Sequence, residues 1–335
     1  MGPSGRDVTA GAAPAPGAAV AGAPEPAGAT ASISDNTIAR LFAKLPGEVS
    51  YKIVAPATRR TAQVPVSSSN SGSRLFIGSA FKTFVLAEAL RQADSPDVVR
   101  TITTQQLALD ASVWSLDSAT FNPPHVSGVV SERTALEAMI LHSDNTGTDM
   151  SMKLVGTDKV RAFIASAGLH NTLIPDSTRS FVGYLLGAPD YLTFTWDQTV
   201  AAANDPMVNP PLNTEQTLAS SADDLVTYYA RALQGDFFEH PQTLNQYRAI
   251  LSIGDVIWLL PLPLGVSAFA KGGSIDVPGF HAVCAAGGMV FDDVWVYFCF
   301  TINWDAAAES DPATIGAWAV ASSQALQLVK DSLAT

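Results

Sequence analysis

Apolar and polar residues alternate along this chain at two spacings, one typical of helices and one typical of strands. Helical spacing predicts a first amphipathic helix over residues 33–45, with Ser34 or Asp35 as its N-cap and Pro46-Gly47 ending it. The same spacing predicts later helices over residues 79–92, 131–142, 146–155, 158–167, 219–234, 241–251 and 312–333. Strands are predicted over residues 49–55, 62–67, 266–271, 280–290 and 294–303, and Asp292-Asp293 joins the last two as a hairpin turn.

The order of these elements predicts the fold class. Strands lie near both ends of the chain with helices between them, which indicates an α+β fold: one mixed sheet closed by the chain ends and a helical domain inserted in the middle. We assign residues 32–78 and 255–335 to a discontinuous α/β domain and residues 79–254 to the helical domain. Residues 169–213 show no sustained period, so we expect a long functional loop there.

Composition limits the location and the partners of the protein. Residues 1–31 are rich in Ala, Gly and Pro, so we expect a flexible leader, which favours a periplasmic or secreted protein over a cytoplasmic one. No stretch has the roughly 18 consecutive apolar residues of a membrane span. A formal net charge of −12 argues against nucleic acids or anionic membranes as partners, because phosphate groups are bound by clustered Lys and Arg.

Cysteine and histidine point to no cofactor. Cys284 and Cys299 lie in the two strands that flank Asp292-Asp293, and two buried free thiols are favoured over a disulfide because a core of this size does not depend on one. The histidines show no metal-ligand spacing, so neither a metal nor a cofactor is expected. His281 is the histidine of most interest, because it begins the strand that follows Lys271.

Ser79-Ala80-Phe81-Lys82 is the most informative motif of the chain. Residues three apart share one face of a helix, and the apolar run that follows predicts a mostly buried helix. The Lys82 amine is therefore expected beside the Ser79 hydroxyl and away from bulk water. Burial disfavours the ammonium form, and a neutral amine can take the serine proton and make Ser79 a nucleophile.

Two further motifs follow. Ser143-Asp144-Asn145 comes directly after a predicted helix, and Lys271-Gly272-Gly273 lies at the end of a predicted strand. Taken singly, the first is typical of a turn at a helix end with an N-cap for the next helix, and the second of a strand that ends in a turn. Only the combination with the serine-lysine motif favours a catalytic interpretation.

The three motifs, in this order and each on its predicted element, resemble those of the penicillin-recognising serine hydrolases, most closely the class A β-lactamase group. The resemblance covers about residues 34–333 and implies a β-lactamase/transpeptidase-like fold, in which an antiparallel sheet is flanked by terminal helices and carries an inserted all-helical domain. It implies that Ser79 is the acylated nucleophile and Lys82 its activating amine. Ser143 would pass a proton to the leaving group, and Lys271 would hold Ser143 and attract anionic substrate.

The resemblance also implies a binding surface. The backbone N–H groups of Ser79 and Ser274 would form an oxyanion hole, whose donors stabilise the negative charge of the transition state. Asn145 would contact the acyl side chain of the substrate, and Gly272 and Gly273 belong to the substrate-binding strand.

Two departures from the family pattern bear on activity. Gly272 replaces the usual Thr or Ser, whose hydroxyl helps to hold the carboxylate of a β-lactam, so slow hydrolysis of penicillins is expected. The Glu that activates the deacylating water in class A enzymes has no counterpart between Gly168 and Asn213, where Asp176 is the nearest carboxylate, with a shorter reach. We expect Lys82 to be the deacylating base instead.

Three functions stay open on these residues. The first is a serine acyl hydrolase that cleaves an ester, amide or lactam bond of a small molecule through an acyl-enzyme on Ser79. The second is a penicillin-binding or sensor module that is acylated without turnover, because no deacylating Glu is visible. The third is a D-Ala-D-Ala carboxypeptidase or transpeptidase.

Overall fold

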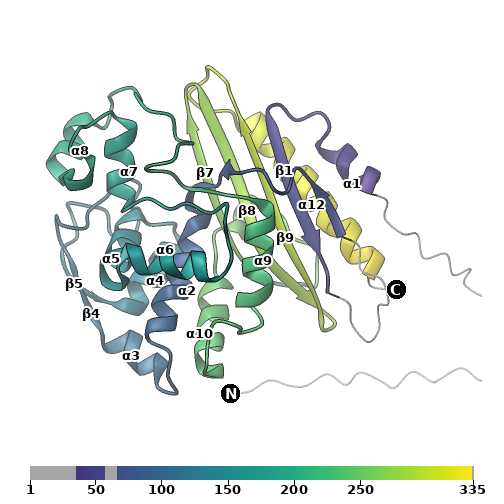
Figure 1. Cartoon of the computed structure of the whole chain (residues 1–335), viewed down its shortest axis with the longest axis horizontal. Helices are drawn as coiled ribbons and strands as arrows, with labels where there is room; N and C mark the ends of the chain where they lie inside the picture. Colours follow the sequence, from purple (N-terminus) through teal and green to yellow (C-terminus); the bar gives the residue numbers. More distant parts are fainter. Residues whose placement is uncertain (1–34, 57–65, 334–335) are drawn as a thin grey trace, which may run out of the picture. The chain divides into compact units, whose positions relative to one another are not determined.

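A five-stranded sheet organises the part of the chain that the structure describes, residues 35–56 and 66–333 of this computed structural model (Figure 1). All its neighbouring strands are antiparallel, which confirms the α+β class and corrects the mixed sheet that the pattern predicted. The turn between the last two strands lies at Asp292-Asp293, as predicted, and both residues have positive φ. In sheet order the strands are β2 (Val66–Ser69), β1 (Glu48–Val54), β9 (Val294–Trp304), β8 (Phe280–Phe291) and β7 (Ser267–Val277).

Strands β8 and β9 are buried on both faces of the sheet, and alternate residues enter two different hydrophobic clusters. Cys284 and Cys299 belong to the cluster on the side of the inserted helices, and Ala285 and Phe300 belong to the other. The second face is covered by α1 (Asp35–Phe42) and α12 (Pro312–Leu333) (Figure 1). This two-sided burial explains the continuous apolar runs of β8 and β9.

Helix α2 (Lys82–Gln92) lies at the centre of the helices on the first face. All of residues 82–90 are buried, because α4, α5, α6 and α10 pack against it. Two short antiparallel pairs complete this side, β3 (Leu75–Phe76) with β6 (Ala219–Ser220) and β4 (Gln106–Leu109) with β5 (Gly128–Ser131). Further helices are α3 (Val98–Thr104), α4 (Glu132–Leu141), α5 (Asn145–Val155), α6 (Thr157–Ser166), α9 (Ala222–Ala232), α10 (Pro241–Leu251) and α11 (Val256–Leu259).

Residues 169–213 are more ordered than the sequence pattern predicted. They contain α7 (Thr178–Leu185), the 3-10 helix η2 (Tyr191–Thr193) and α8 (Trp196–Ala202). Ser177 caps α7 through its side chain, and Thr195 with Gln198 forms a capping box at α8. These helices are too short to show an apolar period, so only their N-capping residues could have indicated them in the sequence.

Other differences are local. Helix α9 begins at Ala222, because Ala219–Ser220 pairs with β3 and Ser221 caps the helix. Strand β7 continues to Val277, beyond the predicted 266–271. Residues 62–65 of the predicted strand 62–67 lie outside the described residues, and the strand continues to Ser69. The short elements α3, β4, β5 and α11 were not predicted.

The described residues, 35–56 and 66–333, fall within one compact unit, so the division into an α/β and a helical domain stays a prediction. The predicted leader, residues 1–31, lies outside the described residues, and export stays a prediction with it. Cys284 and Cys299 are both free and buried, as predicted. Within residues 35–56 and 66–333, no helix has the length and apolar character that crossing a membrane requires.

Candidate active site

Ser79 lies in a tight turn between the sheet and α2. Residues Gly78–Phe81 form the 3-10 helix η1, which leads directly into α2 at Lys82, so α2 begins later than predicted. Just before the turn, Phe76 is held by two hydrogen bonds with Asn303 of β9: its N–H donates to Asn303 Oδ1 (2.8 Å), and Asn303 Nδ2 donates to its carbonyl (2.9 Å). These two hydrogen bonds hold the chain just before the turn against β9 of the sheet.

Glycine is required where η1 meets β7. A Cβ on Gly273 would lie 2.2 Å from the Ile77 carbonyl oxygen and 2.4 Å from the Ser79 nitrogen. Gly78 has a φ of 51°, and a Cβ there would lie 2.6 Å from the Ser274 nitrogen. The two backbone segments therefore approach more closely than side chains allow, which brings the backbone of Ser79 and Ser274 to one wall of the site.

Lys82 is fully buried at the first position of α2. Its Nζ donates to the Ser143 carbonyl oxygen (2.5 Å), to Asn145 Oδ1 (2.6 Å) and to Ser143 Oγ (3.2 Å). Burial, followed by repulsion from Lys271, lowers the pKa of Lys82 from 10.5 to about 7, so much of the amine is neutral at neutral pH. The sequence predicted this burial. The sequence also predicted that the Lys82 amine lies beside the Ser79 hydroxyl. Within the described residues, however, the Lys82 amine forms hydrogen bonds with Ser143 and none with the Ser79 hydroxyl.

Lys271 of β7 is the second buried lysine of the site. Its Nζ donates to Asp255 Oδ2 (2.5 Å), to the Gly272 carbonyl oxygen (2.9 Å) and to Ser143 Oγ (3.1 Å). Burial lowers the pKa of Lys271, and the charge of Asp255 opposes this shift. The Ser143 hydroxyl thus lies within hydrogen-bond distance of both lysine amines, which is the geometry that a proton shuttle needs.

The loop that carries Ser143 is held rigidly. Ser143 has a φ of 54°, uncommon for a residue with a side chain. Asp144 caps α5 and also accepts hydrogen bonds from the backbone N–H groups of residues 120–121. Asn145 uses both ends of its amide, since Oδ1 accepts from Lys82 and Nδ2 donates to the Leu116 carbonyl oxygen (3.0 Å). The loop is therefore the expected helix-end turn with an N-cap, and it also positions the amine of Lys82.

Two cavities meet at Ser79. The first, of about 340 Å³, lies against β7 and α11 and is lined by Ser79, Ser143, Asp255, Val256, Leu259, Gly272, Gly273 and Ser274. The second, of about 470 Å³, lies between the Ser143 loop and α7, and its apolar wall includes Phe81, Phe181, Leu185, Leu218 and Ile275. A carbonyl group bound at Ser79 would have its two substituents in different cavities.

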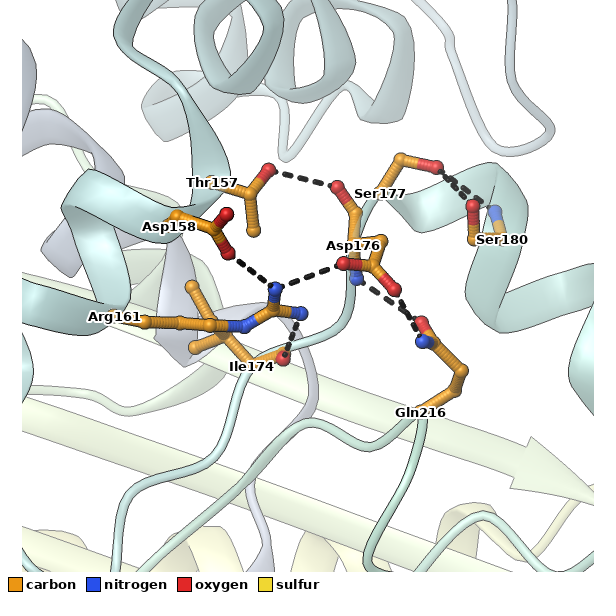
Figure 2. A network of polar contacts seen from close by, with 8 residues as sticks. All are labelled: Thr157, Asp158, Arg161, Ile174, Asp176, Ser177, Ser180 and Gln216. Atoms are coloured by element: carbon orange, nitrogen blue, oxygen red, sulfur yellow. Dashed lines mark hydrogen bonds and ion pairs between the residues drawn. The ribbon is translucent and has the colours of Figure 1, made fainter. Parts of the chain in front are cut away.

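Asp176 belongs to a polar network with Arg161 and Gln216 (Figure 2). Its Oδ1 pairs with Arg161 of α6 (2.8 Å), and its Oδ2 accepts from Gln216 Nε2 (2.6 Å). Arg161 also donates to the Ile174 carbonyl oxygen, so this network ties the loop before α7 to α6. Asp176 does not line either of the two cavities at Ser79.

A different carboxylate, Asp149 of α5, lies beneath the start of α7, and the sequence analysis missed it. Asp149 Oδ1 accepts from the Thr178 nitrogen (2.7 Å) and hydroxyl (2.8 Å), and Oδ2 accepts from the Arg179 nitrogen (3.2 Å). Burial raises the pKa of Asp149 to about 6. Asp149 follows Asn145 by one helical turn, which was the available signal. Thr178 lines the second cavity, so Asp149 positions part of that wall.

Of the histidines, His142 lines the second cavity. His281 is fully buried, bonded through Nδ1 to Asp276 (2.5 Å) and stacked on Trp304. In the described ranges, no group of three or more His, Cys, Asp or Glu side chains is arranged to hold a metal ion.

Residues 33–297 match the sequence model described as the Beta-lactamase enzyme family. The chain belongs to the β-lactamase enzyme family. It is a β-lactamase-like serine hydrolase, as the three motifs implied. No curated protein matches the chain in sequence.

Solved structures show the same β-lactamase/transpeptidase-like fold. TLA-3 extended-spectrum β-lactamase is 15% identical, with 88% of this chain and 98% of that chain covered and a TM-score of 0.67. A β-lactamase from Sphaerobacter thermophilus is 21% identical, with 88% and 99% covered and a TM-score of 0.63. PBP-A is 17% identical, with 89% and 96% covered and a TM-score of 0.63.

Three residues of this β-lactamase-family site escaped the sequence analysis, namely Asn303, Asp149 and Asp255. Asn303 bonds to Phe76, which is far from it along the chain, and Asp255 stands outside the three motifs. No short sequence pattern therefore marks these residues. Gly272, by contrast, was noticed from its motif, and the structure adds that its missing side chain points toward Asp255.

Proposed function

We propose that this chain hydrolyses an ester, amide or lactam bond through an acyl-enzyme on Ser79. The observation that supports this best is the Ser143 hydroxyl, bonded to the amines of Lys82 and Lys271 in the cavity that Ser79 lines. In this proposal Ser79 is the nucleophile, Lys82 the base and Ser143 the proton shuttle, and the backbone N–H groups of Ser79 and Ser274 would stabilise the developing oxyanion.

The proposed acylation step requires the Lys82 amine, which is bonded to Ser143 and Asn145 in this structure, to turn toward the Ser79 hydroxyl. Neutral Lys82 takes the Ser79 proton while Ser79 Oγ bonds to the substrate carbonyl carbon. The bond from that carbon to the leaving oxygen or nitrogen breaks, and the leaving atom receives a proton through the Ser143 hydroxyl, which Lys82 resupplies. Lys271 also donates to Ser143 Oγ and so orients the Ser143 hydroxyl.

Deacylation uses Lys82 again in this proposal. Asp176 is engaged by Arg161 and Gln216, whereas Lys82 already lies next to the Ser143 hydroxyl in the site. Neutral Lys82 takes a proton from water as the water oxygen bonds to the acyl carbon, and the Ser79 oxygen leaves and regains a proton. The apolar wall of the second cavity favours a hydrophobic acyl group.

The test is intact mass read over time after the protein is mixed with a p-nitrophenyl ester or a chromogenic cephalosporin. A hydrolase shows transient acyl mass on Ser79 with continued release of product, and the Ser79→Ala variant shows neither. Undiminished labelling of that variant, or a label mapped to another serine, would refute the proposal.

One observation favours a second candidate, a penicillin-binding module that stays acylated. Asp176, the nearest carboxylate in the loop, is tied into the network of Figure 2, so the water lacks a carboxylate base from that segment. A solved structure similar to this chain shows a mutant of PBP-A in an acyl-enzyme complex with penicillin G. Acyl mass that persists with every substrate would decide for this candidate.

A further inference from the structure

Asp255 places a carboxylate inside the first cavity, at the residue just before α11. Its Oδ2 accepts from Lys271 Nζ (2.5 Å), and its Oδ1 accepts from the backbone N–H of Gly272 (3.0 Å). The Lys271 side chain is fully buried, while 28% of the Asp255 side chain is exposed. Asp255 therefore lies between the buried ammonium and the open part of the cavity.

The Asp255 carboxylate is bonded to the Lys271 amine and the Gly272 N–H, two groups that could otherwise bind an anion. The Lys271 ammonium lies buried behind the cavity wall formed by β7, and the Asp255 carboxylate, which lines the cavity, neutralises it. A second carboxylate bound there would face Asp255 at short range in a partly dry cavity, where like charges repel strongly. An uncharged or positively charged group would meet no such repulsion.

Gly272 completes the arrangement. A Cβ at Gly272 would lie 3.4 Å from Asp255 Oδ1 and 3.8 Å from the Val256 Cα, so a larger side chain would extend toward Asp255. The absent side chain leaves the space in which the Asp255 carboxylate lies. Val256 and Leu259 form an apolar wall beside it.

We propose that Asp255 is a built-in anion that selects substrates whose leaving group carries no carboxylate. The inference rests on the acyl-hydrolase function proposed above and names its substrate class: esters or amides with an uncharged or cationic leaving group. Penicillins, which carry a carboxylate on that side, are disfavoured by Asp255 as well as by the missing hydroxyl at Gly272.

The experiment compares two butyrate esters with the same acyl group, one of 4-nitrophenol and one of 3-carboxy-4-nitrophenol. The quantity measured is the ratio of kcat/KM for the neutral ester to kcat/KM for the carboxylated ester, each divided by its rate of hydroxide-catalysed hydrolysis. Wild-type protein is expected to favour the neutral ester by at least about tenfold, since a charge-assisted contact contributes about ten- to a hundredfold. In Asp255→Asn the ratio is expected to fall by about tenfold or more. Because both esters are measured on each variant, a general loss of activity cancels.

Two controls keep the result specific. Asp292→Asn removes one negative charge at an exposed turn that already has positive φ, outside the residues lining either cavity, and should leave the ratio unchanged. If Asp255→Asn does not fold, Asp255→Ala takes its place. The preference of the wild-type protein for the neutral ester is tested without any variant.

Three outcomes overturn the inference: a wild-type preference for the carboxylated ester, a ratio that Asp255→Asn leaves unchanged, or an equal fall of the ratio in Asp292→Asn. If Ser79→Ala still hydrolyses both esters, the proposed function fails instead, and the two failures are thereby told apart.

Discussion

Removing the positive charge of Lys271 should move the pH dependence of acylation upward. Lys82 is the proposed base, and only its neutral form accepts a proton, so kcat/KM should rise with pH through the pKa of Lys82. Burial and the neighbouring Lys271 hold that pKa at about 7 instead of 10.5. The difference corresponds to about 5 kcal/mol in favour of the neutral amine.

The contribution of Lys271 follows from the geometry. Both amines lie within 3.2 Å of the same Ser143 oxygen, so they are close neighbours. Two unit charges about 6 Å apart at an effective dielectric constant of about 20 repel by about 3 kcal/mol, or about two pKa units. In Lys271→Met this repulsion is gone and the Asp255 carboxylate, which raises the pKa of Lys82, is left without its partner.

The assay is kcat/KM for a neutral p-nitrophenyl ester from about pH 5 to about pH 10, which reports the pKa of the free enzyme. Wild-type protein should show a rising limb centred near pH 7, and Lys271→Met a limb shifted upward by about two pH units. Lys153→Met, which removes an exposed lysine on α5, serves as the charge-matched control and should not shift the limb. Two results would refute the assignment of Lys82 as the base. One is a wild-type limb whose midpoint lies above about pH 9, and the other is a midpoint that does not shift upward in Lys271→Met.

Gly273→Ala should lower acylation at least tenfold and destabilise the fold by about 1–3 kcal/mol, because its Cβ would lie 2.2 Å from the Ile77 carbonyl oxygen and push η1 from β7. Gly316→Ala in α12, whose Cβ meets nothing within 4 Å, is the control for urea unfolding and should be neutral or stabilising. Asp176→Asn loses a half-exposed ion pair with Arg161 and should cost at most about 1 kcal/mol without slowing deacylation. Acyl-enzyme that accumulates in this variant, seen by intact mass, would make Asp176 the deacylating group. Asp149 contributes fully to stability below its unfolded pKa of 3.8 and loses this contribution as pH rises through about 6, because burial raises its folded pKa. The Tm difference between wild type and Asp149→Ala should therefore narrow from about pH 4 to about pH 7, and a difference that widens over this range would contradict the buried carboxylate.

The sequence by itself was enough for the helix that carries Lys82 and the strand that carries Lys271. The spacing of Ser79 and Lys82 before an apolar run placed the lysine in a buried helix, and burial alone predicts a lowered pKa. The apolar runs of residues 280–290 and 294–303, with Asp292-Asp293 between them, predicted the hairpin of β8 and β9. These features are local, because a side chain's direction follows from its place in one element.

Tertiary structure decided which groups meet at the site. Asp255 reaches Lys271 only because the chain before α11 folds back on β7, and Asn303 reaches Phe76 from the far end of the chain. Asp176 had a suitable place in the sequence, yet Arg161 and Gln216 hold it elsewhere. Such contacts join residues through packing of separate elements, so no periodicity records them. The electrostatic character of the site therefore depends on the fold, since an ion pair such as Lys271 with Asp255 exists only after both partners have been brought out of water to one place.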